Sequence, residues 1–175
     1  MYWGDKMQNG LPNRKITRLK DFEYNEDGAY FITICTKNRC CILSQIVGTS
    51  VADGPQIKLT EYGEIANKYI KQLNDFYDYL SVESYVIMPN HIHILLLLNK
   101  NEHGPSRTPV PTVQNSIVSK FISTFKRFCN KEIGENIWQY RSFDHVVRNS
   151  EDYNEIQKYI YNNPLRWQYD KLYTE

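Results

Sequence analysis

The sequence predicts an α+β fold in which helices pack on an antiparallel sheet. Segments rich in β-branched and aromatic residues alternate along the chain with segments whose apolar residues recur at helical spacing. Some of these candidate strands follow one another through short turns, which favours antiparallel pairing. The length of 175 residues is typical of one domain with its own core, so we expect a single domain over residues 1–175.

The first strands are expected near the N-terminal third of the chain. The stretch "AYFITICT" at 29–36 reads as a strand, and "CCILSQIV" at 40–47 is expected to return beside it as a hairpin. A short stretch, "IKLT" at 57–60, is expected to pair briefly before the first helix.

The most apolar strand is expected at the centre of the sheet. "LSVESYVIM" at 80–88 and "HIHILLLL" at 91–98 are separated only by a turn, because Pro and Asn favour turns. The unbroken apolar run at 91–98 suits a strand covered on both faces, so we expect it to be central among four or five strands. A further extended segment is expected within 135–149.

Three helices are expected, and the first two are candidates to cover one face of the sheet. The first spans "EYGEIANKYIKQLNDF" at 61–76 with Thr60 as its N-cap, and the second spans "SKFISTFKRFCNK" at 119–131. The last is expected from about 150 to 162, with Ser150 as a possible cap.

Composition excludes several classes of protein. There is no apolar run of the length that spans a membrane, and the N-terminal residues lack the pattern of a signal peptide, so we expect a cytoplasmic protein without a membrane partner. The four cysteines form no C-x-x-C pair, which argues against a structural zinc site. The net charge of +1 gives no overall signal for nucleic acid. Residues from about 1 to 25 are expected to form a basic N-terminal extension, and residues from about 99 to 113 a flexible loop.

Two histidines stand at the start of the apolar strand, in "MPNHIHILLLL". Successive side chains of a strand point to opposite faces, so His91 and His93 share one face while Ile92 points to the other. Either the two imidazoles are structural and bind backbone carbonyls, or they form a pair of metal ligands.

The last helix places a phenol and an amide on one face. Tyr159 and Asn163 are four residues apart, and Ile156 lies three residues before Tyr159 on the same side. Because the chain holds 14 tyrosines, a packed aromatic is the alternative interpretation of Tyr159.

Basic residues are expected to contact phosphates rather than to take part in chemistry. Lys126 and Arg127 flank the apolar anchor Phe125 on the second helix, and Arg148 follows the "HVV" stretch. A solvated helix face is the ordinary alternative for such charges.

Taken together, "MPNHIH", the later "WQ…FDHVVRN" segment and "KYIYNNP" resemble the HUH-type single-tyrosine transposases, most closely the REP-associated tyrosine transposase (IS200-like) branch. The resemblance extends from "AYFITICTKNR" to "NNPLRW" and implies the ferredoxin-like (RRM-like) fold of those enzymes.

The resemblance also implies roles for particular residues. His91 and His93 correspond to the metal-binding pair, Asn163 to a third, amide-type ligand, and Tyr159 to the nucleophile. Such enzymes cut single-stranded DNA, form a 5′-phosphotyrosine link and release a 3′-OH, with a divalent ion such as Mg or Mn. We therefore expect single-stranded, hairpin-containing DNA as partner, and a homodimer.

Two other functions stay open at this point. One is a non-catalytic protein that binds DNA hairpins and retains the fold. The other is a metal-dependent hydrolase with water as nucleophile, although only His103 and His145 remain as further histidine ligands. A covalent protein–DNA adduct would distinguish the transposase-like chemistry from both.

Overall fold

The main sheet has four antiparallel strands, as the sequence predicted. The computed structural model describes residues 26–48, 55–99 and 116–174. In spatial order the strands of the sheet are β4 (Leu80–Ile87), β5 (His91–Leu98), β1 (Gly28–Cys35) and β6 (Phe143–Val147). The apolar strand β5 is interior, between β4 and β1, which confirms its predicted central position.

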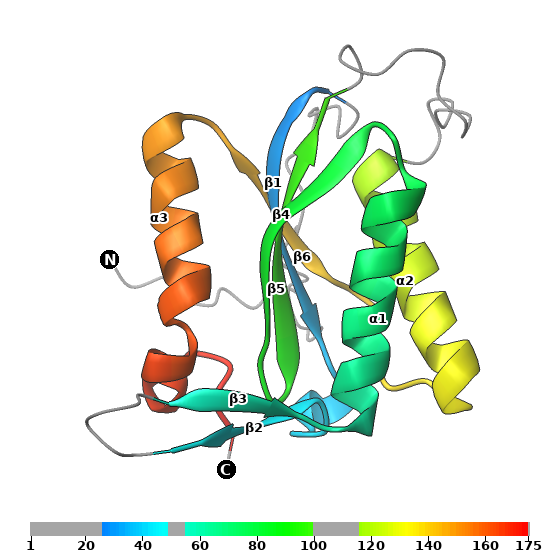
Figure 1. The fold of residues 1–175 in the computed structure, drawn as a ribbon, viewed down its shortest axis with the longest axis vertical. Helices are drawn as coiled ribbons and strands as arrows, with labels where there is room; N and C mark the ends of the chain where they lie inside the picture. The colour runs from blue at the N-terminus through cyan, green and yellow to red at the C-terminus, as the bar shows by residue number, and fades with distance from the viewer. Residues whose placement is uncertain (1–25, 49–54, 100–115, 175) are drawn as a thin grey trace, which may run out of the picture.

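Helices cover both faces of this sheet (Figure 1). Helices α1 (Glu61–Phe76) and α2 (Ile117–Ile133) lie side by side on one face, as predicted, and α3 (Ser150–Asn162) lies on the other. A turn of 3-10 helix, η2 (Pro164–Tyr169), follows α3 directly. The arrangement is therefore an α+β fold of three layers.

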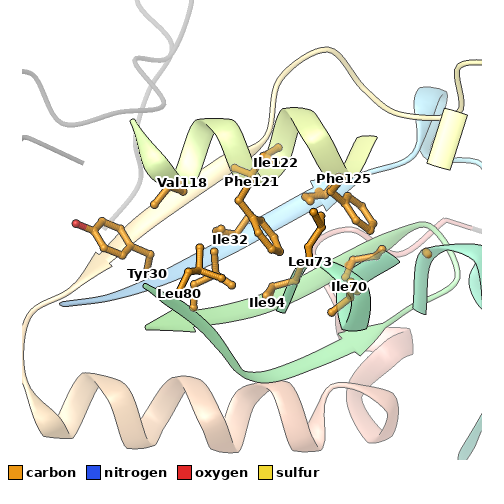
Figure 2. Packing of buried hydrophobic residues seen from close by; sticks show 14 of the residues in the cluster. Tyr30, Ile32, Ile70, Leu73, Leu80, Ile94, Val118, Phe121, Ile122 and Phe125 are labelled. Atoms are coloured by element: carbon orange, nitrogen blue, oxygen red, sulfur yellow. The ribbon is translucent and has the colours of Figure 1, made fainter. Parts of the chain in front are cut away.

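The larger core lies between the sheet and the helices α1 and α2. Figure 2 shows Phe121 and Phe125 of α2 pointing toward Ile32 and Ile94 of the sheet, with Ile70 of α1 beside them. All five side chains are fully buried. A smaller cluster on the α3 face contains Leu95, Ile160 and Trp167 among its buried residues. The strand β5 is thus buried on both sides.

The expected hairpin between the first two strands is wrong. β2 (Ser44–Val47) pairs instead with β3 (Gln56–Leu59) in a separate two-stranded sheet. After β1 the chain makes a short 3-10 turn, η1 (Lys37–Arg39), in which Asn38 has a positive φ. The physical reason is that β5 and β6 occupy both edges of β1, so that no edge is left for β2.

The connection between β1 and β2 is bonded to the end of the β4–β5 hairpin. Thr36 donates its N–H to the carbonyl of Asn90, and Leu43 donates to Pro89, both at 2.9 Å. The Ser44 hydroxyl donates to the carbonyl of Ile87. These bonds hold the β1–β2 connection against the turn that precedes the two histidines.

Of the two N-cap residues predicted, one is confirmed and the other lies one residue earlier. Thr60 caps α1 as predicted, since its hydroxyl accepts from the N–H of Gly63. For α3 the cap is Asn149 rather than Ser150, because the Asn149 side chain accepts from Asp152 N at 2.8 Å. Asn and Ser cap equally well, so the sequence alone could not decide between neighbours.

The predicted N-terminal extension over about 1–25 lies outside the described residues, as does the predicted loop apart from Asn99. Within the described part of the chain, none of the helices combines the length and the apolar character needed to cross a membrane.

Candidate active site

The two histidines face the α3 side of the sheet together. In the register of the sheet His91 lies opposite Cys35 of β1, and His93 lies opposite Thr33. Both rings are buried, and their centroids are 4.5 Å apart. The shared face follows from the alternation of side chains along a strand, so the structure brings together the pair that the sequence singled out.

The ring of His91 is oriented by its neighbour in the turn. Nδ1 of His91 lies 2.8 Å from Oδ1 of Asn90. An amide oxygen only accepts hydrogen bonds, so Nδ1 carries the proton and Nε2 keeps its lone pair. That Nε2 atom is buried and has no hydrogen-bond partner among the described residues.

His93 connects the sheet to α3, the helix that carries Tyr159. Its Nδ1 lies 2.9 Å from the Thr33 hydroxyl, and its Nε2 lies 3.3 Å from the Tyr159 hydroxyl. The ring of Phe31 stacks on it at a centroid distance of 5.0 Å. His93 is therefore fixed on three sides, with Nε2 directed toward α3.

Burial keeps both imidazoles neutral near pH 7. Desolvation lowers the pKa of His91 to about 4. Desolvation, and then the neighbouring His91, lower the pKa of His93 to about 3. Neutral imidazoles retain lone pairs, and a lone pair is what a metal ligand must offer.

Tyr159 is the half-exposed member of the site. The residue is 39% exposed, and its ring packs edge-on against Phe31. Its hydroxyl donates to Oδ2 of Asp170 at 3.2 Å. Burial, and then the nearby Asp170 carboxylate, raise the pKa of Tyr159 to about 12, so the phenol is protonated at neutral pH.

Asn163 lies at the end of α3, one turn beyond Tyr159, and is buried. Its Nδ2 donates to Oδ2 of Asp170 at 3.1 Å, whereas its Oδ1 is buried without a partner in the described part of the chain. The predicted common face of Tyr159 and Asn163 is thus observed, and both side chains contact the same carboxylate.

Asp170 is the site residue that the sequence prediction missed. Ligand atoms of His91, His93 and Asp170 lie within 4.8 Å of one another. Burial by itself would raise the pKa of Asp170, but hydrogen bonds from the Leu172 N–H and from Asn163 hold it below its ordinary value. Its only signal in the sequence is that it is the single carboxylate between 163 and 174.

These residues fit a divalent cation. Two buried polar atoms, Nε2 of His91 and Oδ1 of Asn163, carry lone pairs and have no hydrogen-bond donor among the described residues, which is costly unless something binds them. With His93 and the Asp170 carboxylate, the donors are two imidazoles, an amide oxygen and a carboxylate oxygen. Such a mixed set suits a first-row divalent metal.

The segment that carries Asp170 is attached to the histidine turn. Nδ2 of Asn90 donates to the carbonyl of Leu172 at 2.8 Å and lies 3.1 Å from the Thr174 hydroxyl. Nη1 of Arg39 donates to the carbonyl of Lys171 at 3.2 Å. The carboxylate therefore approaches the histidines because residues far away in the sequence hold the backbone after η2.

A cleft of about 900 Å³ opens beside the tyrosine. His93 and Tyr159 form part of its wall, and Phe143 of β6 and Tyr169 of η2 also line it. His93 reaches this cleft, whereas His91 lies deeper, beside the ring of Trp167.

The three basic residues predicted to bind DNA lie apart from this cleft lining. Nζ of Lys126 donates to the carbonyl of Gln139 at 2.8 Å, and burial lowers its pKa to about 8. Arg127 is exposed on α2, where it lies over the ring of Phe128. Arg148 is exposed between β6 and α3.

Comparisons with known proteins give relatives over most of the chain. No family model matches it. An uncharacterized protein of Haemophilus influenzae is 30% identical over 185 residues, which cover 97% of this chain and 98% of that protein. The REP-associated tyrosine transposase of Escherichia coli is 25% identical over 143 residues, 82% of this chain and 70% of that protein.

A solved structure has the same fold. It is the structure of a REP-associated tyrosine transposase bound to a REP hairpin, with a TM-score of 0.59 and 21% identity over 88% of this chain and 77% of that chain. This similarity confirms the predicted α+β fold. The sequence similarity over most of the chain makes this protein a distant homologue of the REP-associated tyrosine transposases (IS200-like).

Proposed function

We propose that this protein cleaves and transfers single-stranded DNA, with Tyr159 as nucleophile beside a divalent cation held by His91 and His93. The observation that carries the proposal is the position of the Tyr159 hydroxyl, 3.3 Å from Nε2 of His93 and 3.2 Å from Asp170. A phenol at the wall of a cleft, next to a set of metal ligands, is the arrangement that a tyrosine transesterase requires.

The proposed cation site has His91 and His93 as nitrogen ligands and Asn163 as an oxygen ligand, with Asp170 as a further oxygen donor. Bound there, the cation would withdraw charge from an oxygen of the scissile phosphate. Imidazole ligands favour manganese over magnesium in affinity, whereas oxygen ligands suit both. We propose Mg or Mn as the ion.

In the proposed step the oxygen of Tyr159 forms a bond to phosphorus while the bond between phosphorus and the 3′ oxygen breaks. The hydroxyl proton passes to the Asp170 carboxylate, which already accepts its hydrogen bond. Asp170 then returns that proton, through solvent, to the departing 3′ oxygen, which becomes a free 3′-OH, so atoms and charge balance. The downstream strand stays attached to Tyr159 through its 5′ phosphate until a 3′-OH reverses the step.

The proposed substrate is a hairpin with a single-stranded flank. The Escherichia coli relative is a REP-associated tyrosine transposase, and the similar solved structure contains a REP hairpin. Arg127 and Arg148, both exposed, are proposed to contact phosphates of such a hairpin, and Lys126 is proposed as a weaker contributor because its ammonium is bound to backbone carbonyls. A symmetric homodimer is proposed as the assembly.

The experiment that tests this function is adduct formation. A pool of DNA hairpins with randomised single-stranded flanks is labelled at the 3′ end and incubated with the protein and Mn²⁺, then resolved under denaturing conditions. A 5′-phosphotyrosine link puts the 3′ label on the protein, whereas a 5′ label stays on a shortened free strand.

The matched variants are Tyr159→Phe and Tyr161→Phe on the same helix. Tyr161 is 82% exposed, so removing its hydroxyl is a control for the general effects of a substitution on α3. We expect labelled protein from the parent and from Tyr161→Phe, and none from Tyr159→Phe or with EDTA. Hairpin binding without any adduct in the parent would instead support the non-catalytic hairpin-binding function.

A further inference from the structure

The cleft beside Tyr159 differs from the rest of the molecule in charge. Four cationic residues line it, against the single carboxylate of Asp170, although the whole chain has a net charge of only +1. The four are Arg39, Arg141, Arg166 and Lys171. All four are exposed, so an anionic ligand in the cleft can reach them.

Two exposed aromatic residues also line this cleft. Phe143 is 52% exposed and Tyr169 is 86% exposed. Single exposed aromatic residues are ordinary, but two of them beside arginines in one concave surface indicate a binding site. Each ring has an arginine close by in sequence, Arg141 before Phe143 and Arg166 before Tyr169.

The register of the sheet places Phe143 in line with the proposed metal ligands. Thr33 of β1 lies opposite His93 on one side and opposite Phe143 on the other, so the three side chains share the α3 face in one row. Two strand spacings separate the backbones of His93 and Phe143, which is about 10 Å. β6 is the edge strand, so nothing in the described sheet covers its outer side.

Exposed rings and cations together fit a single strand of nucleic acid better than a duplex. Paired bases in a duplex are stacked on one another, whereas the faces of single-stranded bases are free to stack on an aromatic side chain. Arginines beside the ring can bind the phosphates that connect these bases.

We propose that Phe143 is the stacking platform for the base of a nucleotide next to the scissile phosphate, and that Arg141 and Arg166 bind the phosphates of the flanking strand. The inference rests on the proposed function only in taking Tyr159 as the place of cleavage. It predicts that affinity for the flank comes from the β6 and η2 walls of the cleft, independently of the metal and of the nucleophile.

The test measures binding without cleavage. A DNA hairpin with a thymidine flank carries fluorescent aminopurine in place of one thymidine at a time, and it is titrated in EDTA with the Tyr159→Phe protein. Stacking on an aromatic ring quenches aminopurine, so we expect quenching at one position of the flank. Phe143→Leu should abolish that quenching and weaken binding roughly tenfold, since stacking on an aromatic ring contributes about 1–3 kcal/mol per base.

Two further variants and one control sharpen the test. Phe143→Trp should restore both the quenching and the affinity, which a merely structural role of Phe143 would not explain. Arg141→Gln and Arg166→Gln should each reduce the slope of log affinity against log salt by about 0.7, as expected for a single strand. Tyr161→Leu removes an exposed ring outside the cleft and should change neither reading.

Unchanged quenching and affinity in Phe143→Leu would overturn the inference, whether or not Tyr159 forms an adduct. If Tyr159→Phe still cleaves DNA while aminopurine quenching depends on Phe143, the proposed nucleophile is wrong and the stacking platform stands. Thermal unfolding of each variant checks that the exposed substitutions leave the fold intact.

Discussion

The two faces of the sheet differ in chemistry although the same strands form both. On the α1 and α2 face, Ile32 and Ile34 of β1 meet Ile92 and Ile94 of β5, all fully buried. Thr33, His91 and His93 alternate with these isoleucines along the strands, so they lie on the α3 face, and they are buried as well. Because the strand period is two, one sequence supplies an apolar core and a polar site without either intruding on the other.

Stability and function therefore depend on different faces of the sheet. The apolar face is packed mainly by aliphatic and aromatic side chains, so its contribution to stability comes mostly from packing and from the removal of apolar surface from water. The polar face buries groups whose desolvation is costly, and two of its lone pairs have no donor in the described structure. We expect substitutions on the first face to change stability, and those on the second to change metal and DNA chemistry.

The largest effect on stability is expected from the apolar face. Phe121→Ala in α2 removes a fully buried ring and leaves a cavity, so the free energy of unfolding should fall by about 3–5 kcal/mol. Tyr159→Phe on the other face removes one half-exposed hydroxyl and should cost about 1 kcal/mol or less. Equilibrium urea denaturation of both variants measures this contrast. Equal losses in the free energy of unfolding would contradict it.

The polar face should make stability depend on pH. In the metal-free protein the pKa of His91 is about 4 and that of His93 is about 3, both below the ordinary value of 6.5. Above pH 6.5 the histidines are neutral in both states and stability is at its full value. As pH falls from 6.5 toward 4, the unfolded chain takes up protons that the folded site refuses, and the free energy of unfolding falls by up to roughly 3 kcal/mol per histidine.

Denaturation in EDTA at a series of pH values measures this dependence. His91→Leu and His93→Leu should each flatten the curve between pH 6.5 and 4, because each removes one group that binds protons only after unfolding. A curve that stays as steep in both variants would contradict a neutral, desolvated histidine pair.

Divalent metal should stabilise the protein through the polar face alone. A ligand present at a hundred times its Kd raises the free energy of unfolding by about 2.7 kcal/mol. Mn²⁺ should therefore raise the Tm of the parent and of Phe121→Leu, but not of His91→Ala or His93→Ala. Calorimetric melts with and without Mn²⁺ provide the measurement, and an undiminished shift in both histidine variants would place the ion elsewhere.

The parts that could be predicted from the sequence are those that depend on local periodicity. The unbroken apolar run at 91–98 predicted an interior strand, and the spacing of His91 and His93 predicted a shared face. The spacing of four between Tyr159 and Asn163 likewise predicted their common side of α3. In each case the side-chain directions follow from the repeat of a strand or helix.

The predictions that were wrong or incomplete concern contacts between residues that are distant in sequence. β2 does not pair with β1, because β6, more than a hundred residues later, occupies that edge. Asp170 reaches the histidines because Asn90 and Arg39 hold the segment after η2. No periodicity in the residues around Asp170 contains that information.

The smallest expected effect concerns Asn90, which connects His91 to the segment that carries Asp170. Asn90 accepts from His91 through Oδ1 and donates to the carbonyl of Leu172 through Nδ2. The first bond fixes the proton of His91 on Nδ1, and residues that orient metal ligands in this way typically contribute 10–100-fold in metal affinity. Asn90→Ala should therefore weaken Mn²⁺ binding by about that factor.

Asn90→Asp separates the two bonds. A carboxylate still accepts from His91, but it cannot donate to the Leu172 carbonyl, so metal affinity should stay within a few-fold of the parent while the segment carrying Asp170 is released. Thr174→Val is the matched control, because it removes the other contact of Nδ2 and leaves His91 untouched. Titration calorimetry with Mn²⁺ gives the affinities, and hydrogen exchange at residues 171–174 reports the release. If Asn90→Asp loses metal as completely as Asn90→Ala, the terminal segment, and not the orientation of His91, is what Asn90 contributes to the site.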